Sequence, residues 1–320
     1  MLTLAAMEDA AKIVYGAISP TPQYAWPLIG EAVGKTVWVK HENHTPIGAF
    51  KVRGGLVYLK NFADHSTTGQ GIISATRGNH GQSLAFAAKR FGLPCTIVVP
   101  HGNSTEKNAA MRAFGATLVE HGRDFDEAKA HAFDLAEEQH LHFVPSFHAD
   151  LVRGVATYGL EFLRSVPELD VIYVPIGLGS GICGMISARD ALGLKTKIIG
   201  VVSSKADAYA RSFETGDYKE TDSASTFADG MAVRCPSEEA LAVIRAGAED
   251  VIRVSEDDVA EAMRLYYRAT HNIAEGAGAA ALAALLADAN RGSVPGIVLS
   301  GQNVDRDVFA KVLEGETPEI

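Results

Sequence analysis

The stretch that decides the fold is residues 71–100, which read GIISATRGNHGQSLAFAAKRFGLPCTIVVP. Two short apolar runs, at 71–75 and 95–100, are typical of buried strands. The segment between them, 80–91, has the apolar spacing of a helix. A strand, a helix and a second strand in this order predict a parallel sheet covered by helices. Ligands bind at the carboxyl ends of such strands, so the loop that follows the first run is a candidate site.

The same alternation continues and divides into two series. The first series adds helices and strands at 105–114, 116–119, 125–138 and 142–144. The second series has strands at 171–175, 197–201, 251–254 and 296–300, and helices at 182–191, 257–270 and 279–289. We therefore predict an α/β protein with two lobes. The polar segment 212–225 is expected to be an excursion on the surface.

Composition excludes several classes of protein. The 320 residues are 47% hydrophobic, enough for a large core, and the net charge of -10 argues against a nucleic-acid partner. We find neither a signal peptide nor a run of about 20 apolar residues, so we expect a cytoplasmic protein without a membrane contact. Neither the cysteines nor the histidines have the spacing of a disulfide framework or a metal site, and each cysteine is expected to be buried. These residues are Cys95, Cys183, Cys235, His140, His142 and His148.

A first motif that could carry chemistry is TPIGAFKVRGG at 45–55. Lys51 lies between Phe50 and Val52, and desolvation there would lower the pKa of its ammonium group and leave a nucleophilic amine. Most lysines in such a setting extend to the surface instead. The motif alone leaves both interpretations open.

Three further motifs follow predicted strands. In ATRGNHG, at 75–81, free amides at a helix start suit a carboxylate, although Asn79 could simply cap the helix. In PIGLGSGI, at 175–182, three alternating glycines and Ser180 suit a phosphate. A single phosphate is favoured over a dinucleotide, because the glycine spacing is not G-x-G-x-x-G. In VLSGQNVD, at 298–305, Ser300 could donate to a ring nitrogen or be a turn residue.

Taken in this order, the four motifs resemble those of the fold-type-II pyridoxal-phosphate enzymes, specifically the serine/threonine dehydratase and serine racemase family. The resemblance covers nearly the whole chain. It implies a tryptophan synthase β-like fold and a homodimer. The implied large cofactor-binding domain comprises 1–53 and 148–320, and the small domain 54–147. Each domain would have a mostly parallel sheet flanked by helices.

The resemblance also implies roles for individual residues. Lys51 would bind pyridoxal 5′-phosphate covalently and act as the general base. The implied cofactor contacts are Phe50, Lys51, Asn79, Gly177, Leu178, Gly179, Ser180, Gly181, Gly230, Glu275 and Ser300. The implied substrate contacts are Thr76, Arg77, Gly78 and His80.

The implied activity is β-elimination of water from a β-hydroxy amino acid of the serine or threonine type, which yields a keto or imino acid. A neutral serine facing the ring nitrogen, here Ser300, favours this elimination over transamination. Racemisation of serine or aspartate, and β-replacement as in cysteine synthase, are the alternatives of the same fold. A third alternative is a ligand-binding or regulatory protein that keeps the fold but catalyses no reaction.

Departures from the family pattern bear on the substrate. Arg77 stands where relatives carry Ser or Ala, and it is a poor proton donor, so racemisation should be weak. An arginine there suits a second carboxylate, which favours 3-hydroxyaspartate, unless it points to solvent or pairs with a structural carboxylate. The segments 154–157 and 300–303 also differ from the pattern of the standard threonine enzymes. They suggest a separate subgroup, for which the dehydratases of 3-hydroxyaspartate and hydroxyectoine breakdown are the relatives to consider.

Two further features of the family are not expected here. The acidic metal ligand of racemases is missing after 197–201, and we predict no metal. About 20 residues follow Ser300, so we expect no C-terminal regulatory domain.

Overall fold

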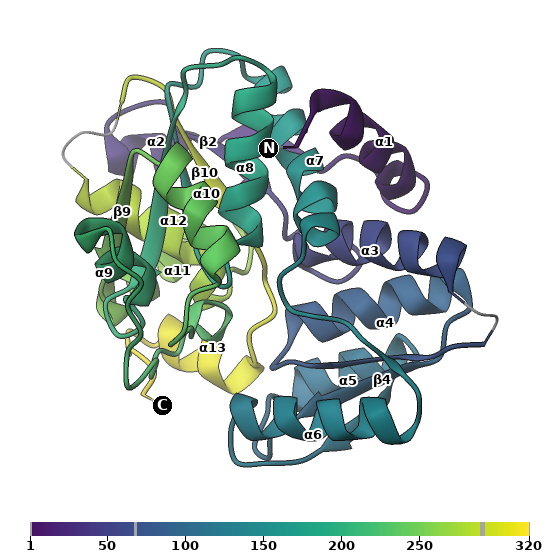
Figure 1. Cartoon of the computed structure of the whole chain (residues 1–320). Coiled ribbons are helices and arrows are strands. Elements are labelled where there is room, and N and C mark those ends of the chain that lie inside the picture. The colour runs from purple at the N-terminus through teal and green to yellow at the C-terminus, as the bar shows by residue number, and fades with distance from the viewer. Residues whose placement is uncertain (1, 67–68, 289–291, 320) are drawn as a thin grey trace.

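Two sheets organise the computed structural model, which describes residues 2–66, 69–288 and 292–319 (Figure 1). The six-stranded sheet has the order β1-β2-β10-β7-β8-β9, and the four-stranded sheet has the order β5-β4-β3-β6. The strands of the first are β1 (Gln23–Ala25), β2 (Trp38–His41), β10 (Pro295–Leu299), β7 (Val171–Pro175), β8 (Lys197–Ser203) and β9 (Asp250–Val254). Those of the second are β5 (Thr117–Glu120), β4 (Cys95–Val99), β3 (Ile72–Ala75) and β6 (His142–Phe143).

All neighbouring strands run parallel except β1, which pairs antiparallel with β2. The predicted α/β class with mostly parallel sheets is therefore confirmed. The prediction of a domain boundary at 53/54 and 147/148 stays a prediction.

Helices cover both sheets. They are α1 (Leu4–Tyr15), α2 (Pro27–Val33), α3 (Lys51–His65), α4 (Asn79–Phe91), α5 (Thr105–Ala113), α6 (Phe125–Glu138), α7 (Ala149–Ser165), α8 (Ser180–Ala191), α9 (Ala208–Thr215), the short 3₁₀ helix η1 (Asp229–Met231), α10 (Glu238–Gly247), α11 (Glu256–Thr270), α12 (Gly276–Ala287) and α13 (Arg306–Leu313). In Figure 1, α3 to α6 gather around the four-stranded sheet, whereas α8 to α12 lie around the six-stranded one.

The six-stranded sheet is apolar on both faces, as a parallel sheet between two helix layers must be. In β7, Val171 and Tyr173 pack with the core formed by α11 and α12, whereas Ile172 and Val174 pack with the core formed by α7 and α8. This alternation follows from the two-residue repeat of a strand. It explains why the strands read as continuous apolar runs in the sequence.

The predicted boundaries differ from the observed ones at several places. The helix predicted from Ile182 begins at Ser180, and the helix predicted at 279–289 is α12, with residue 289 outside the described residues. The segment 212–225 is not wholly a surface excursion, because Ser212 is buried within α9. Cys235 is exposed, so the prediction that each cysteine is buried was wrong for this one.

The start of α3 is held to the six-stranded sheet by a buried ionic network. Arg53 is fully buried, and its guanidinium contacts Glu42 at 2.7 Å and Glu161 at 2.6 Å. Lys40 adds a second cation, 2.5 Å from Glu161. Buried charges persist only when they are paired, so this network fixes the orientation of the helix that begins at Lys51.

Two properties of the described residues are also relevant to function. No described helix has both the length and the apolar character needed to cross a membrane. Within 2–66, 69–288 and 292–319, no three His, Cys, Asp or Glu side chains gather as a metal site requires. The prediction that the protein holds no metal stays a prediction.

Candidate active site

Lys51 lies at the first residue of α3, and its amine faces the start of α8. The preceding backbone is fixed to the end of β10, because Phe50 N donates to Ser300 O at 3.0 Å. Lys51 Nζ donates to Ser180 Oγ at 3.3 Å and lies over the ring of Phe50. Burial lowers the pKa of Lys51 to about 8, although the charge of Glu275 raises it. The amine therefore lies within the site and has nucleophilic character.

The turn between β7 and α8 needs glycine for packing at two positions. A Cβ at Gly177 would lie 2.3 Å from the carbonyl oxygen of Gly230. Gly179 has a φ of +100°, and a Cβ there would lie 2.6 Å from the Cβ of Ala240. Leu178 lies between them, and its carbonyl accepts a hydrogen bond from Tyr209 at 3.0 Å. The protein's own packing thus explains these two glycines.

Gly181 has a different environment. A Cβ there would lie 3.6 Å from Phe50 Cζ and 3.6 Å from Tyr158 Oη, which are ordinary contacts. A methyl group would therefore fit beside Gly181 without displacing Phe50 or Tyr158. The first N–H groups of α8, which begins at Ser180, have no partner within the helix, and the helix dipole favours an anion there. These residues fit a phosphate, and the amine of Lys51 beside Ser180 fits the aldehyde of pyridoxal phosphate.

Asn79 connects the substrate turn with Glu275, which is 196 residues later in the chain. Asn79 Nδ2 donates to Glu275 Oε1 at 2.7 Å, and Asn79 Oδ1 accepts from Asn303 Nδ2 at 2.8 Å. Gly78, not Asn79, is the N-cap of α4. The alternative interpretation of Asn79 as a capping residue was therefore wrong.

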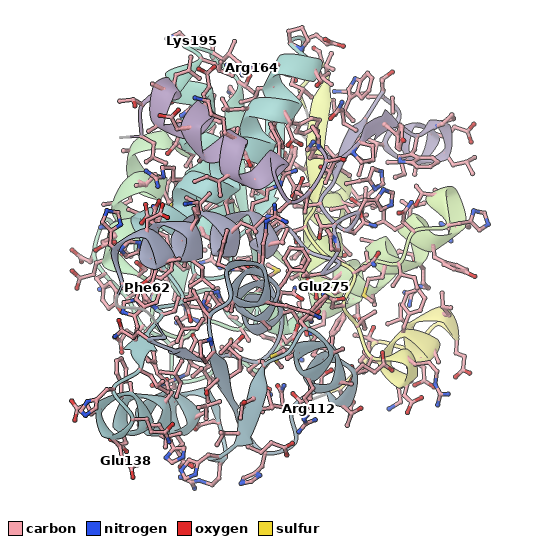
Figure 2. The ribbon with its side chains drawn as sticks, turned by 90° about the vertical axis from the view of Figure 1, so that its right-hand side faces the viewer. Phe62, Arg112, Glu138, Arg164, Lys195 and Glu275 are labelled. Atoms are coloured by element: carbon pink, nitrogen blue, oxygen red, sulfur yellow. The ribbon has the colours of Figure 1, made fainter. Side chains whose placement is uncertain are left out.

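Glu275 is 3% exposed and lies well inside the outline of the molecule (Figure 2). Its Oε2 has no hydrogen-bond partner among the described residues. Burial raises the pKa of Glu275 to about 7, although the ammonium group of Lys107 lowers it. The charges of Glu275 and Lys51 thus influence each other within the site.

Ser300 and Gly230 lie on either side of Ala277. Ser300 follows β10, is 5% exposed, and its Oγ donates to Ala277 O at 3.5 Å. Gly230, in η1, has its carbonyl oxygen against Gly177, and a Cβ at Gly230 would lie 2.9 Å from the Cβ of Ala277. Both residues thus flank the start of α12, and Gly230 also meets the glycine turn.

The predicted substrate turn follows β3. Thr76 is buried, and its Oγ1 accepts from Gly78 N at 3.0 Å. His80 is buried, and no described residue forms a hydrogen bond with its Nε2. Burial, together with the charge of Lys51, lowers the pKa of His80 to about 3. Arg77 is exposed, and no described residue forms an ion pair with it. A guanidinium group at the turn is thus available to a ligand.

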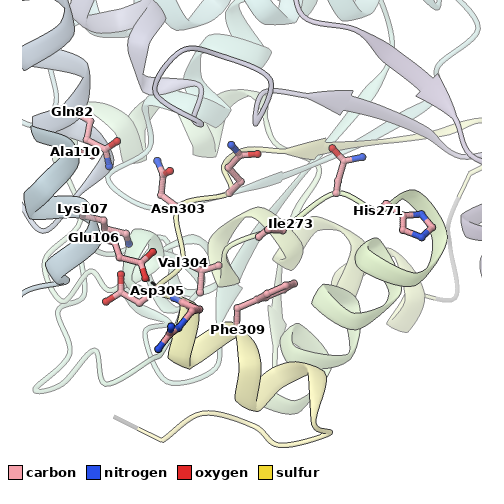
Figure 3. A pocket seen from close by; sticks show the side chains of 13 residues that line it. Gln82, Glu106, Lys107, Ala110, His271, Ile273, Asn303, Val304, Asp305 and Phe309 are labelled. Carbon is pink, nitrogen blue, oxygen red and sulfur yellow. Dashed lines mark hydrogen bonds between the residues drawn. The ribbon is translucent and has the colours of Figure 1, made fainter. Parts of the chain in front are cut away.

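Sequence reasoning missed Lys107, whose Nζ contacts Asp229 and approaches Glu275. Figure 3 shows Lys107 and Asp305 near each other in the lining of a cavity. This cavity has a volume of about 550 Å³, and Asn303 also lines it. No local pattern marks Lys107, because it is one of several charged residues on a short amphipathic helix.

Residues 14–301 match the family model described as pyridoxal-phosphate dependent enzyme. The chain belongs to this family. This pyridoxal-phosphate-dependent enzyme is 32% identical over 309 residues to the L-threo-3-hydroxyaspartate ammonia-lyase of a Pseudomonas species. The match covers 96% of this chain and 97% of that relative. The predicted resemblance, fold and pyridoxal phosphate cofactor are thereby confirmed.

Two further proteins show how far the similarity to this pyridoxal-phosphate-dependent enzyme extends. It is 31% identical over 306 residues to the biosynthetic L-threonine dehydratase of Haemophilus influenzae, and the match covers 94% of this chain. The chain spans only 60% of the length of that relative. The solved structure of maize serine racemase superposes with a TM-score of 0.91 at 27% identity, and the match covers 98% of this chain and 97% of that one.

Proposed function

We propose that this pyridoxal-phosphate-dependent enzyme is an ammonia-lyase that eliminates water from a β-hydroxy amino acid. The dehydrated amino acid leaves as an enamine, and its hydrolysis by one water molecule gives a keto acid and ammonia. The observation that carries the proposal is the buried amine of Lys51, whose pKa is lowered to about 8 and which lies 3.3 Å from Ser180 Oγ at the start of α8, where free N–H groups suit a phosphate. The names of the Pseudomonas and Haemophilus relatives, an ammonia-lyase and a dehydratase, support the same reaction class.

Residues of this chain account for the positioning and the proton transfer. Lys51 and the turn that contains Gly181 would hold the cofactor, with Asn79 and Ser300 on its ring. When bound, the cofactor draws electrons from the Cα of the amino acid joined to it. The amine of Lys51 then removes the Cα proton, because a pKa of about 8 leaves part of it unprotonated near neutral pH. Ser300 would present a neutral hydroxyl to the ring, which would favour elimination over transamination.

We propose 3-hydroxyaspartate as the substrate. Arg77 is exposed at the turn that would hold the substrate carboxylate, and no described carboxylate pairs with it. A guanidinium group can bind a second carboxylate through two parallel hydrogen bonds. The Pseudomonas relative, which is named for L-threo-3-hydroxyaspartate, supports this choice.

The test is an assay of keto-acid release from L-serine, L-threonine and each isomer of 3-hydroxyaspartate. We expect the highest kcat/KM on an isomer of 3-hydroxyaspartate. Arg77→Ser should lower that value by about 10- to 150-fold, since a hydrogen bond to a charged group is worth about 1.5–3 kcal/mol, and should affect L-serine little. Arg112→Ser, which removes an exposed arginine of α5, is the control.

Two results would contradict these proposals. If Arg77→Ser leaves the substrate preference unchanged, Arg77 does not bind a second carboxylate. If no substrate releases a keto acid from a chain that holds its cofactor, the proposed lyase reaction is wrong.

We also propose that the chain forms a homodimer through a surface that contains α2 and α11. Leu28 of α2 lies in a surface hollow that Leu265 and Ala269 of α11 also line, and large apolar side chains near these helices are 40% to 48% exposed. They are Tyr24, Leu28, Tyr267 and Ile273. Light scattering after gel filtration should give twice the chain mass for the wild type and less for Leu28→Glu. A monomeric wild type at micromolar concentration would contradict the proposal.

A further inference from the structure

Lys107 is a buried cation that the proposed reaction does not use. Its Nζ donates to Asp229 Oδ2 at 2.5 Å and lies 3.9 Å from Glu275 Oε2, the oxygen without a hydrogen-bond partner among the described residues. The side chain of Asp229 is 34% exposed, whereas that of Glu275 is 4% exposed. Water therefore compensates part of the charge of Asp229, but Glu275 depends on its protein neighbours.

Lys107 reaches Glu275 from the part of the fold that contains the other sheet. It lies on α5, which packs against α4 and β5. Glu275 is instead the N-cap of α12, which packs on the six-stranded sheet. The stem of Lys107 crosses the substrate turn at Gly78, where a Cβ would lie 2.7 Å from Lys107 Cδ. A glycine at this position thus leaves room for the lysine.

Other residues in the same turn of α5 hold it in this place. Ser104 Oγ donates to Asp305 Oδ1, and Glu106 Oε1 accepts from the backbone N–H of Arg306 at 2.9 Å. Figure 3 shows Glu106, Lys107 and Asp305 grouped together in the lining of the cavity. The position of the Lys107 ammonium group is therefore defined by contacts beyond its own ion pairs.

We propose that Lys107 is a positioning residue that sets the charge of Glu275. Asp229 and Glu275 compete for one ammonium group, which lies closer to Asp229. The charge of Glu275 in turn decides how strongly it accepts the hydrogen bond from Asn79 Nδ2, because bonds to ionised acceptors are stronger. Lys107 thus acts on the cofactor site through Glu275 and Asn79.

Among the described residues, four groups determine the charge of Glu275. Lys107 from α5 and Lys51 from α3 favour the ionised form, and Asn79 from α4 does so through its hydrogen bond. Asp229 from η1 opposes it. Because burial raises the pKa of Glu275 to about 7, removal of any one group should change its ionisation near neutral pH. Removal of Lys107 should raise the pKa of Glu275, and removal of Asp229 should lower it.

The test is a titration of Glu275 by NMR in the full chain with its cofactor and without substrate. The glutamates carry ¹³C at the side-chain carboxyl, and Glu275→Gln identifies the resonance by its disappearance. Lys107→Met should raise the titration midpoint by about 1 pH unit or more, because an opposite charge within about 4–6 Å lowers a carboxyl pKa by about 1–3 units. Asp229→Asn should lower the midpoint. Lys107→Arg, which keeps the charge, should leave it near the wild-type value.

The control is Arg112→Met, which removes an exposed cation of the same helix and should leave the midpoint unchanged (Figure 2). General loosening of the structure would shift Lys107→Met and Asp229→Asn in the same direction, and that result would overturn the inference. So would an unchanged midpoint in Lys107→Met. If Lys107→Met does not fold, Asp229→Asn decides, because the inference requires a lower midpoint.

This inference rests on the proposed function in one respect, because the proposed function places Glu275 at the cofactor site. The titration needs no substrate. Failure of the lyase assay and failure of the titration are therefore separate results.

Discussion

Replacement of Gly181 by alanine should separate folding from cofactor binding. The added methyl group would meet Phe50 and Tyr158 at 3.6 Å, which requires no movement of the protein. Alanine is favoured over glycine within a helix by about 0.5–1 kcal/mol, so the cofactor-free variant should be slightly more stable than the wild type. For a chain of this size that gain corresponds to a rise in Tm of about 1–3 °C. The same methyl group would occupy the space assigned to the phosphate.

Cofactor binding should respond in the opposite way. If the methyl group prevents one or more charge-assisted hydrogen bonds, each worth about 1.5–3 kcal/mol, the Kd for pyridoxal phosphate should rise by about 10- to 150-fold or more. Thermal unfolding of the cofactor-free chain measures the first effect, and a fluorescence titration with pyridoxal phosphate measures the second.

Gly177→Ala is the matched control, because its Cβ would lie 2.3 Å from Gly230 O and should destabilise the fold itself. The reasoning is refuted if Gly181→Ala binds pyridoxal phosphate as tightly as the wild type. It is also refuted if Gly181→Ala destabilises the cofactor-free chain as much as Gly177→Ala does.

Three further predictions concern other residues. Lys51→Ala should lose the visible absorbance band that reports covalent attachment of the cofactor, and a retained band would exclude Lys51 as the attachment residue. Arg53→Met should lower the free energy of unfolding by about 3–5 kcal/mol in urea, because it leaves Glu42 and Glu161 buried without this cation, and a loss below about 1 kcal/mol would contradict the ionic network. His80, whose pKa burial lowers to about 3, stays neutral in the folded chain while the unfolded chain binds a proton below about pH 6.5. The free energy of unfolding therefore decreases as the pH is lowered, and this residue accounts for about 2 kcal/mol of the decrease at pH 5. In urea unfolding, His80→Gln should lose about 2 kcal/mol less stability than the wild type between pH 7 and pH 5. Equal losses in the variant and the wild type would show that His80 does not titrate in this way.

The elements with the strongest local signals were predicted well. The strands β3, β4 and β7 are apolar runs bounded by turn residues, and they lie within a residue of the predicted positions. Boundaries at glycine-rich turns were less accurate, because α8 begins at Ser180 and α12 at Gly276, both before the predicted starts. A helix that starts among glycines has no apolar periodicity to mark its first turn.

The candidate site was predictable only in part. The glycine turn and Lys51 could be found because their motifs are contiguous in sequence. The exposure of Arg77 and the burial of His80, whose Nε2 has no hydrogen-bond partner in the described part of the chain, depend on packing and became visible only in the structure. Lys107 was missed because neither of its carboxylate partners is near it in the chain.

Alone, the sequence determined the α/β class and the order of the motifs, because strand periodicity and glycine turns are local properties. The role of Lys51 as the residue that holds pyridoxal phosphate was implied by the resemblance of the ordered motifs to a known family and stays a prediction. Only the tertiary structure decided which distant charges meet. Asn79 and Glu275 are 196 residues apart yet share a hydrogen bond, and Lys107 lies 3.9 Å from Glu275 although it comes from the part of the fold that contains the other sheet. The physical reason is that the ionisation of a buried carboxyl group depends on its distance to charges and on its exposure to water, and both are set by packing.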